Sequence, residues 1–387
     1  MDCKKVLFDE LLPFWTERLT DQECGGFFTC INGNGDVNTE KKHIWLVSRT
    51  LWTYSSVCNM YGKEEKYLEI CEQAFNFLKT CTLQDGKLPF IVDRRGRAIK
   101  TADNLHSDAY AAMACAAYYK VSGKDEVMQY ACLYFDCAMR HYMKVLNSPE
   151  YASQNTFAVH CLVHYTARFM QEINEEYRYY SELSLENMLS EDYPHNKYGM
   201  LLEHKERREN TCCPGDVFFA AWMLLSENVQ RKDARIELFV RKNLDSMERF
   251  YSEREFGLIP LSYRPEVDEQ AEVYRFWPHW EALVAYTLAA KIFKDEKYKR
   301  YAKLMERTIF KYFADEPKKL FYCNIDATGK PLDFSGHGDL FHIPRALMVL
   351  DSVKTFFAIS HKNNKCTLRG LAMDDLLTDG VFGDINP

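Results

Sequence analysis

Apolar residues recur at three- and four-residue spacing through most of the chain, and strict alternation of apolar and polar residues is rare. This periodicity is typical of amphipathic helices rather than of strands. It predicts about twelve helices, near residues 3–20, 41–61, 64–82, 105–122, 125–145, 153–172, 175–190, 215–228, 231–251, 277–293, 296–314 and 341–358. We therefore expect an all-α protein.

Short polar turns join these helices in pairs, and they recur every 50 to 65 residues, at 61–64, 122–125, 173–175, 230–233 and 293–296. One helical hairpin repeated about six times predicts a closed ring of six inner and six outer helices, an (α/α)6 barrel. An open solenoid of hairpins is the alternative. The long connections on the other side of the hairpins favour the barrel, because they are rich in aromatic residues, glycine and proline.

The long connections, 21–40, 83–104, 191–214, 252–276 and 315–340, are expected to gather at the end opposite the short turns. Loops that a rigid scaffold holds are common places for ligand sites. A few short strands are expected in them, around residues 26–30 and 320–323. Residues 1–360 form the predicted catalytic barrel domain, and residues 361–387, where the helical periodicity is lost, form a tail or a lid.

Composition narrows the class of protein. The 387 residues are 47% hydrophobic, carry a net charge of −7, and mix basic with acidic side chains, which argues against a nucleic-acid surface and favours a small-molecule partner. No apolar run of about 18 residues predicts a membrane span. The 14 cysteines are irregularly spaced and indicate reduced thiols in a cytoplasmic protein. A homodimer is compatible with the sequence, which does not fix the assembly.

One predicted helix start stands out at residues 214–222, where proline and glycine precede Asp216 and an apolar helix ends in Trp222. As a plain helix cap, Asp216 needs no further function. As a carboxyl at the loop-bearing end of a barrel, it is a candidate for proton transfer. Both interpretations are open from the residues alone.

Three other clusters carry candidate chemistry. Arg49 lies one helical turn after Trp45, and an arginine in an apolar helix needs a partner such as a polyhydroxylated or anionic ligand, or a buried carboxylate. The run 276–281 sets aromatic faces beside a carboxylate, a combination that suits a sugar ring. Its candidate site residues are Trp277, His279 and Glu281. His342 follows a glycine-rich loop at 335–339 and opens a predicted helix, a position that favours a neutral imidazole able to accept a proton.

Several other chemistries lack their motifs. The sequence has no nucleophile elbow for a Ser-His-Asp hydrolase, no phosphate-binding Gly-x-x-x-x-Gly-Lys and no dinucleotide fingerprint. His160 and His164 lie four residues apart and could hold a metal, but no third ligand follows at a fixed spacing. We expect neither a metal nor another cofactor, and we place His160 among the substrate-binding residues.

Taken together, these clusters resemble the N-acylglucosamine 2-epimerase family, which includes cellobiose 2-epimerases and aldose–ketose isomerases. The resemblance covers most of residues 8–350. It rests on residues 25–30 with Asn34 and Gly35, Trp45 and Leu46 with Arg49, Pro214 and Gly215 with Trp222, Trp277, Pro278 and His279 with Glu281, and Phe341 and His342 with Pro344 and Arg345.

The resemblance implies the same barrel and a reaction in which a proton α to a carbonyl is removed from a ring-opened sugar, through an enediolate. In that family, two histidines serve as acid and base, an arginine holds the carbonyl side of the sugar, and glutamates adjust the pKa values of the histidines. Arg49, His342 and Glu281 match the arginine, one histidine and one glutamate. The second histidine falls on Asp216, and a glutamate three residues later falls on Phe219.

These two replacements bear on the reaction. An aspartate has an ordinary pKa of about 3.9, against about 6.5 for histidine, so it is the weaker base unless burial raises its pKa. Phe219 makes the surroundings more apolar, which acts in that direction. Epimerisation must return the proton to the opposite face of the carbon, whereas aldose–ketose isomerisation needs one base on one face, which His342 alone can supply.

We therefore expect a cytoplasmic sugar 2-epimerase or aldose–ketose isomerase, acting on an N-acetylhexosamine or a hexose. His342 is the main acid/base, Asp216 a substitute proton carrier, Arg49 the carbonyl anchor and Glu281 an orienting group, with Trp45, Trp277 and His279 lining the pocket. Two alternatives remain. One is a glycoside hydrolase or lyase that uses Asp216 and Glu281 as its carboxylate pair, and the other is a sugar-binding protein without catalysis.

Overall fold

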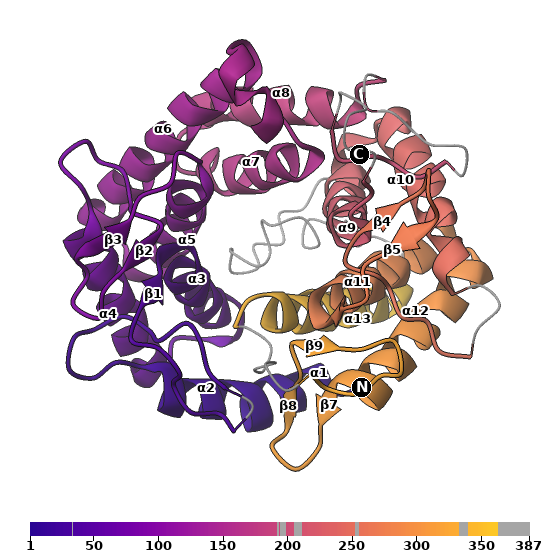
Figure 1. Ribbon diagram of the computed structural model, residues 1–387, viewed down its shortest axis with the longest axis horizontal. Helices are drawn as coiled ribbons and strands as arrows, with labels where there is room; N and C mark the ends of the chain where they lie inside the picture. The colour runs from indigo at the N-terminus through magenta and orange to yellow at the C-terminus, as the bar shows by residue number, and fades with distance from the viewer. Residues whose placement is uncertain are drawn as a thin grey trace.

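In the described part of the chain, six inner helices and six outer helical segments form two concentric rings (Figure 1). The computed structural model describes residues 1–32, 34–191, 193, 199–204, 211–251, 255–332 and 340–362. The inner ring consists of α3 (Ile44–Tyr61), α5 (His106–Ser122), α7 (Phe157–Met170), α9 (Pro214–Arg231), α11 (Phe276–Phe293) and α13 (His342–Lys362). The outer ring consists of α4 (Glu65–Cys81), α6 (Asp125–Asn147), α8 (Arg178–Leu189), α10 (Ala234–Ser246), α12 (Glu296–Thr308) and the continuous N-terminal segment α1 (Cys3–Lys5), η1 (Val6–Leu11) and α2 (Leu12–Leu19). The predicted (α/α)6 barrel is confirmed.

The inner and the outer helices differ in how much of their surface is apolar and buried. Inner helix α5 buries a nearly continuous run of small apolar residues, 109–117 apart from half-buried Tyr110, because it has neighbours on every side. Outer helix α12 buries only one stripe, which includes Tyr298, Leu304 and Met305, and turns its lysines and arginines outward. Four of the outer helices are extended by short 3₁₀ or π segments, η2 (Pro149–Gln154), η3 (Glu175–Tyr177), η4 (Met247–Phe250) and η5 (Ile309–Phe313).

The short turns predicted from the sequence share a backbone conformation. Four inner helices end on a residue of positive φ, namely Gly62, Gly123, Lys232 and Lys294. A residue of positive φ stops a helix and reverses the chain within a few residues. After two of these stops, an aspartate caps the next outer helix, with Asp233 accepting from the amide of Arg235 and Asp295 from that of Lys297. Each inner helix therefore starts at the end of the barrel that carries the long connections.

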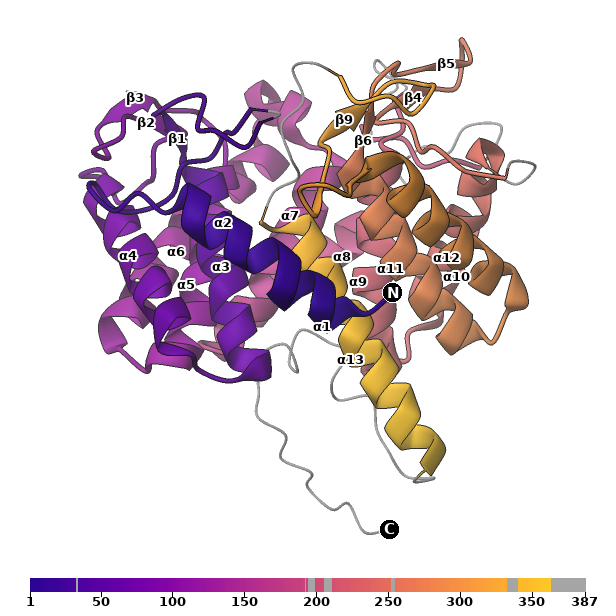
Figure 2. The same cartoon turned by 90° about the horizontal axis from the view of Figure 1, so that it is seen from below.

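The long connections contain short antiparallel strands that gather at one end of the barrel (Figure 2). They are β1 (Lys42–His43), β2 (Ile91–Val92) and β3 (Ala98–Lys100) in one sheet, and the pairs β4 (Tyr263–Arg264) with β5 (Glu269–Gln270), β6 (Tyr274–Arg275) with β9 (Asn324–Ile325), and β7 (Ala314–Asp315) with β8 (Leu320–Phe321).

One of the two predicted strands is confirmed and the other is wrong. β8 lies within the predicted 320–323, whereas 26–30 forms only an isolated bridge between Phe27 and Thr20. Gly25 and Gly26 have φ values of 76° and 68°, which bend the chain, and a Cβ on Gly26 would lie 2.7 Å from the ring of Phe77. Because the backbone bends at Gly25 and Gly26 and the ring of Phe77 packs against it, this segment forms a tight loop rather than a strand.

A buried ion pair fixes this loop to its neighbours. Lys42 is fully buried, and its Nζ donates to Asp21 Oδ2 at 2.8 Å, to the carbonyl of Gly25 at 2.7 Å and to that of Arg94 at 3.0 Å. Burial raises the pKa of Asp21, but hydrogen bonds from Arg94 and Lys42 outweigh it and hold that pKa well below its usual range. Three segments that border the barrel mouth are therefore tied to one cation.

The two ends of the described chain complete the ring. The first helix lies against α13, and Lys354 Nζ donates to the carbonyl of Met1 at 2.7 Å. Helix α13 also contacts α3 and α11 and so closes the inner circle. The predicted glycine-rich loop at 335–339 and residues 363–387 of the predicted tail lie outside the described residues, while residues 361 and 362 belong to α13. None of the described helices is long and apolar enough to cross a bilayer.

Candidate active site

All six inner helices present residues of their first turns to one cavity of about 710 Å³, a size that suits a small-molecule ligand. The contributing side chains are Trp45 of α3, His106 of α5, Ala158 of α7, Asp216 of α9, Trp277 of α11 and His342 of α13. The N-terminal end of a helix carries a partial positive charge, so a developing anion in this cavity is stabilised from several directions. The scaffold therefore favours negative charge on a bound ligand.

His342, the first residue of α13, is held by Glu281 from α11. Its Nδ1 lies 2.7 Å from Glu281 Oε1. Arg345 Nη2 donates to the same oxygen at 2.5 Å, and Trp222 Nε1 donates to Oε2 at 2.6 Å. Burial raises the pKa of Glu281, but Arg345, His342 and Trp222 together lower it to about 2. Glu281 is therefore an ionised group that orients the imidazole.

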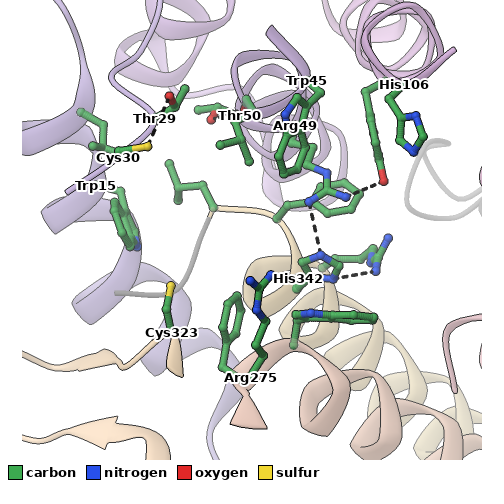
Figure 3. A pocket seen from close by; sticks show the side chains of 18 of the residues that line it. Trp15, Thr29, Cys30, Trp45, Arg49, Thr50, His106, Arg275, Cys323 and His342 are labelled. Carbon is green, nitrogen blue, oxygen red and sulfur yellow. Dashed lines mark hydrogen bonds between the residues drawn. The ribbon is translucent and has the colours of Figure 1, made fainter. Parts of the chain in front are cut away.

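The hydrogen bonds assign the tautomer of His342. Arg49 Nη1, which can only donate, lies 3.3 Å from Nε2 (Figure 3). Nε2 therefore carries a lone pair, and Nδ1 carries the proton that is donated to Glu281. Arg345 also lies 3.3 Å from Nδ1, and since that atom already bears a hydrogen, this approach is a packing contact rather than a hydrogen bond. The result is a neutral imidazole whose basic nitrogen meets the cavity.

Arg49 reaches the cavity between three aromatic rings. Its guanidinium carbon lies 4.5 Å from the ring centre of Trp45, 4.3 Å from that of Tyr110 and 4.6 Å from that of Phe341. Nη2 donates to the hydroxyl of Tyr110 at 2.5 Å. The rings stabilise the cation and fix its plane. Arg49 thus lines the cavity beside His342, and its role as an anchor for a carbonyl oxygen stays a prediction.

Asp216 is the third residue of α9 and lines the same cavity. The helix begins at Pro214 with Cys213 as its N-cap, so the interpretation of Asp216 as a plain N-cap is wrong. Burial raises the pKa of Asp216 to about 7; Cys213 and Arg49 lower it, while Glu203 and Glu281 raise it further. Near neutral pH this carboxyl is protonated in a substantial fraction of molecules and can donate or accept a proton.

Trp277 links the start of α9 to His342. Its ring stacks at a 33° tilt over the His342 imidazole, with centroids 5.3 Å apart. On the other side it covers Gly215 so closely that a Cβ there would lie 2.2 Å from the indole. A glycine is thus required before Asp216, because any side chain at position 215 would collide with the indole of Trp277.

The family model for N-acylglucosamine 2-epimerase (GlcNAc 2-epimerase) matches residues 26–346. The chain belongs to this family. It is 23% identical to the N-acylglucosamine 2-epimerase of Mus musculus over 393 residues, with 89% of each chain covered. It is 29% identical to the cellobiose 2-epimerase of Bacteroides fragilis over 143 residues, or 36% of each chain.

Several solved structures share the fold of this chain. A sugar epimerase from a ruminal bacterium superposes with a TM-score of 0.78 at 19% identity, covering 91% of this chain and 98% of the other. A D-mannose isomerase gives 0.77 at 14% identity, with 92% and 96% covered. An α-mannanase of Bacteroides thetaiotaomicron gives 0.56 at 10% identity, with the same two coverages. At these identities the likeness shows the barrel alone.

Two predicted substrate-binding histidines do not line the cavity of this family member. His279 is fully buried, accepts from the amide of Ile259 at 2.9 Å and donates to the carbonyl of Arg275 at 2.8 Å. Burial lowers the pKa of His279 to about 3, so it is a neutral structural residue. His160 is also fully buried, between the hydroxyl of Tyr142 and Oδ1 of Asn155. The expected substrate contacts of both residues are corrected.

The pair of His160 and His164 also does not form a metal site. His164 lies 2.9 Å from the carbonyl of Ser181 through Nδ1 and 2.7 Å from Glu227 through Nε2. All four ring nitrogens of the pair therefore contact protein groups. Among the described residues no cluster of three or more potential metal ligands occurs.

Phe219 replaces a family glutamate with an aromatic contact. Its ring centre lies 4.6 Å from the guanidinium carbon of Arg345, and the rings of Tyr165, Trp222 and Phe341 lie within 5.3 Å of the same carbon. The buried Arg345 is thus stabilised by four rings and by Glu281. The replacement leaves the support of Glu281, and hence of His342, in place.

Sequence reasoning gave no role to three residues of the site, although it named Arg345 as part of a matching motif. Tyr110 binds Arg49, Arg345 binds Glu281, and His106 lines the cavity with a pKa that burial, Arg49 and His141 lower to about 4. Arg345 offered a usable signal, because an arginine within an apolar helix needs a partner, which is the argument that singled out Arg49. Tyr110 and His106 offered none, since aromatic residues are frequent throughout the chain.

Proposed function

We propose that this protein is a sugar 2-epimerase that works by proton transfer on a ring-opened sugar. The observation that carries the proposal is the presence on one cavity of His342, whose Nδ1 is held by Glu281 and whose Nε2 lies beside Arg49, and of Asp216 with a pKa of about 7. An imidazole base and a carboxyl that is partly protonated near neutral pH are what a two-group proton transfer needs.

The steps follow from these positions. His342 Nε2 takes the proton from C2, and the electron pair of the C2–H bond forms the enediolate with the carbonyl oxygen on C1. Arg49 and the surrounding helix N-termini stabilise that oxyanion. Protonated Asp216 then delivers its proton to the opposite face of C2, which inverts the centre. Finally, protonated His342 releases its proton to solvent and ionised Asp216 takes one from solvent, which restores the starting state.

Aldose–ketose isomerisation is the second candidate reaction in the same class. His342 alone can carry the proton from C2 to C1 on one face, while the hydroxyl proton passes from O2 to O1 and Arg49 holds the two oxygens. It is favoured if Asp216 serves only to hydrogen-bond a hydroxyl. The sugar class that we propose, an N-acetylhexosamine or a hexose, follows the substrates in the names of the relatives.

The hydrolase or lyase alternative has little geometric support. Glu281 is 1% exposed and lies outside the cavity lining, and its two oxygens accept hydrogen bonds from His342, Arg345 and Trp222. A carboxylate so engaged is not available as a nucleophile or as a base for water. Asp216 would have to act without the partner that this alternative assigned to it.

We also propose that the protein works in the cytoplasm and as a homodimer. Thirteen described cysteines are free thiols, most of them buried, which suits a reducing compartment. The fourteenth, Cys366, lies outside the described residues. Light scattering on the purified protein tests the homodimer.

The decisive experiment is a panel of aldoses, ketoses and N-acetylhexosamines in heavy water, followed by NMR. The parent is expected to incorporate deuterium at C2 and to form the 2-epimer. Asp216→Asn is expected to retain exchange at C2 but to lose the inverted product, and His342→Ala is expected to lose both. Glu191→Gln, which changes the charge of an exposed residue, is the control.

Other outcomes point elsewhere. If Asp216→Asn retains full activity while His342→Ala abolishes it, the one-base isomerase replaces the epimerase. Cleavage of a glycosidic bond without deuterium incorporation would support the hydrolase. Thermal stabilisation by a sugar without exchange or turnover would support the sugar-binding protein.

A further inference from the structure

His106 lines the cavity, and neither of its ring nitrogens bonds to a residue that the structure describes. It is the first residue of α5, and Figure 3 shows it on the same side of the cavity as Trp45 and Arg49. Its Nδ1 is buried without a hydrogen-bond partner. His342, by contrast, contacts Glu281 through Nδ1 and Arg49 through Nε2. A polar side chain left unpaired at a cavity wall is a candidate for binding a ligand.

The burial of Nδ1 decides where the imidazole of His106 carries its hydrogen. A buried N–H without a partner costs more free energy than a buried lone pair without one, so the hydrogen is on Nε2 rather than on Nδ1. Nε2 lies at the end of the ring farthest from the backbone and is the nitrogen that reaches the cavity. Burial, Arg49 and His141 lower the pKa of His106 to about 4, so the ring is neutral near neutral pH. His106 therefore presents one uncharged N–H donor.

Asn104 adds a second donor two residues earlier. Its Oδ1 accepts from the backbone amide of His106 at 3.1 Å. Because a backbone amide can only donate, the side-chain atom that it contacts is the oxygen. Nδ2 is then the polar atom of Asn104 that remains for the cavity, and no residue within the described ranges bonds to it. Asn104 and His106 thus place two uncharged donors on the same stretch of the cavity wall.

Hydrogen bonds to the neighbouring residues hold this stretch in place. The hydroxyl of Tyr151 donates to Asp103 Oδ2 at 2.7 Å, and Gln154 Nε2 donates to the carbonyl of Asp103 at 2.9 Å. The amide of Ala109 donates to the carbonyl of Leu105 at 2.9 Å and so begins the bonding of α5. The two donors are therefore positioned before any ligand binds, which reduces the entropy lost on binding.

The two donors lie apart from the proposed base. Tyr110 follows His106 by one helical turn on α5, and Tyr110 bonds to Arg49. Arg49 in turn lies 3.3 Å from His342. The wall from His342 to His106 therefore runs past Arg49 and Tyr110.

We propose that His106 and Asn104 form a second part of the substrate site, which binds an oxygen of the sugar that the reaction does not change. Two uncharged donors suit the lone pairs of a hydroxyl or an acyl oxygen, whereas an anionic group would favour the arginines that line the same cavity. His106 then determines affinity and the choice of sugar rather than the rate of proton transfer. The assignment to a sugar rests on the proposed function, but the arrangement of the two donors does not.

NMR of the full-length protein with isotope-labelled histidine tests the donor directly, with the His106 signals assigned as those that His106→Gln removes. The parent is expected to show a neutral His106 with its hydrogen on Nε2. The probes are D-glucitol and N-acetyl-D-glucosaminitol, open-chain alditols that cannot react because they lack the aldehyde.

A shift of the His106 Nε2 signal with D-glucitol assigns the bound oxygen to a hydroxyl, and a shift with the acetylated probe alone assigns it to the acyl group. A hydrogen on Nδ1 in the free protein overturns the proposal. An unchanged His106 signal with both probes, at the highest concentration of each, overturns it as well.

Calorimetry with the alditol that shifts His106 gives a second readout. His106→Met, an apolar side chain of similar size, is expected to weaken binding by about 5- to 10-fold. His106→Gln is expected to restore most of the affinity, because its amide nitrogen can take the place of Nε2. An equal loss in both variants overturns the proposal.

Asn104→Asp retains the oxygen that accepts from the His106 amide and replaces only the donor. It is expected to weaken binding while the thermal unfolding midpoint is retained. Unchanged binding in this variant removes Asn104 from the site and overturns the proposed pair. His43→Gln is the control, since His43 is also half-buried but does not line the cavity, and it is expected to leave binding unchanged.

Kinetics separate this proposal from the proposed function. On N-acetylglucosamine or D-mannose, His106→Met is expected to raise KM by the same factor and to keep kcat within about twofold, because His106 contacts no reacting atom. A large fall in kcat with an unchanged KM would place His106 in the chemistry and overturn the proposal. Alditol binding with the expected losses, but without turnover of any sugar, upholds the donor pair and overturns the proposed function instead.

Discussion

His342 Nδ1 lies 2.7 Å from Oε1 of Glu281, and this one contact sets which nitrogen of the imidazole is basic. Glu281 can only accept, so the proton stays on Nδ1 and the lone pair stays on Nε2 toward the cavity. The chemistry of the site depends on this orientation as much as on the identity of the base.

Glu281→Gln is expected to lower kcat by about 100-fold or more, because a glutamine can donate to Nδ1 and thereby stabilise the wrong tautomer. KM is expected to change little, since Glu281 does not line the cavity. Steady-state kinetics test this split. A variant whose KM rises while kcat is retained would show that Glu281 contacts substrate.

Gly215→Ala is expected to displace the ring of Trp277, since the new Cβ would lie 2.2 Å from it. Overpacking of this kind costs about 1–3 kcal/mol of folding free energy. We expect a larger loss of activity than of stability, because Trp277 stacks on His342. Adding Trp277→Phe, which shortens the ring, is expected to restore stability in the double variant, and failure to do so would place the strain elsewhere.

Lys42→Met is expected to destabilise the fold by about 3–5 kcal/mol, because it leaves the buried carboxylate of Asp21 without its closest cation. Chemical denaturation measures the loss. Lys41→Met is the matched control, since Lys41 is the exposed neighbour and is expected to change stability by less than about 0.5 kcal/mol. Equal effects of the two variants would contradict the importance assigned to the buried pair.

Asp108→Asn is expected to reduce the pH dependence of stability between pH 4 and pH 7. Burial raises the pKa of Asp108 to about 7, while the hydrogen bond from the Leu88 amide lowers it. A carboxyl whose folded pKa is raised stabilises the fold fully below its unfolded pKa, and this contribution is lost as the pH rises through the folded value. Denaturation at several pH values is expected to show the parent losing about 4 kcal/mol more than the variant over this window, at about 1.4 kcal/mol for each pH unit.

Much of the fold was predictable because each helical hairpin can be read from local sequence. The apolar spacing and the recurring polar turns predict helices whose bounds agree closely with those of α3, α5 and α11. The loop at 26–30 was not predictable, since its shape depends on the ring of Phe77 from a different helix.

The two misassigned histidines have a common physical cause. His279 follows Trp277 by two residues, and His160 lies midway between Ala158 and Leu162, which both line the cavity. Two residues correspond to about 200° of rotation on an α-helix, so each histidine lies on the face away from the cavity. Helical geometry could have separated these residues, whereas the presence of an imidazole in a promising motif could not.

The closure of the ring by the first helix and α13 has a consequence for how the protein is made. His342 and Arg345 belong to the last inner helix, while Arg49 lies in the first. During synthesis the earlier hairpins can fold in order, but His342, the proposed base, joins them only when α13 docks between α3 and α11. The nascent chain therefore acquires its chemistry in a single late step, after the walls of the cavity are already in place.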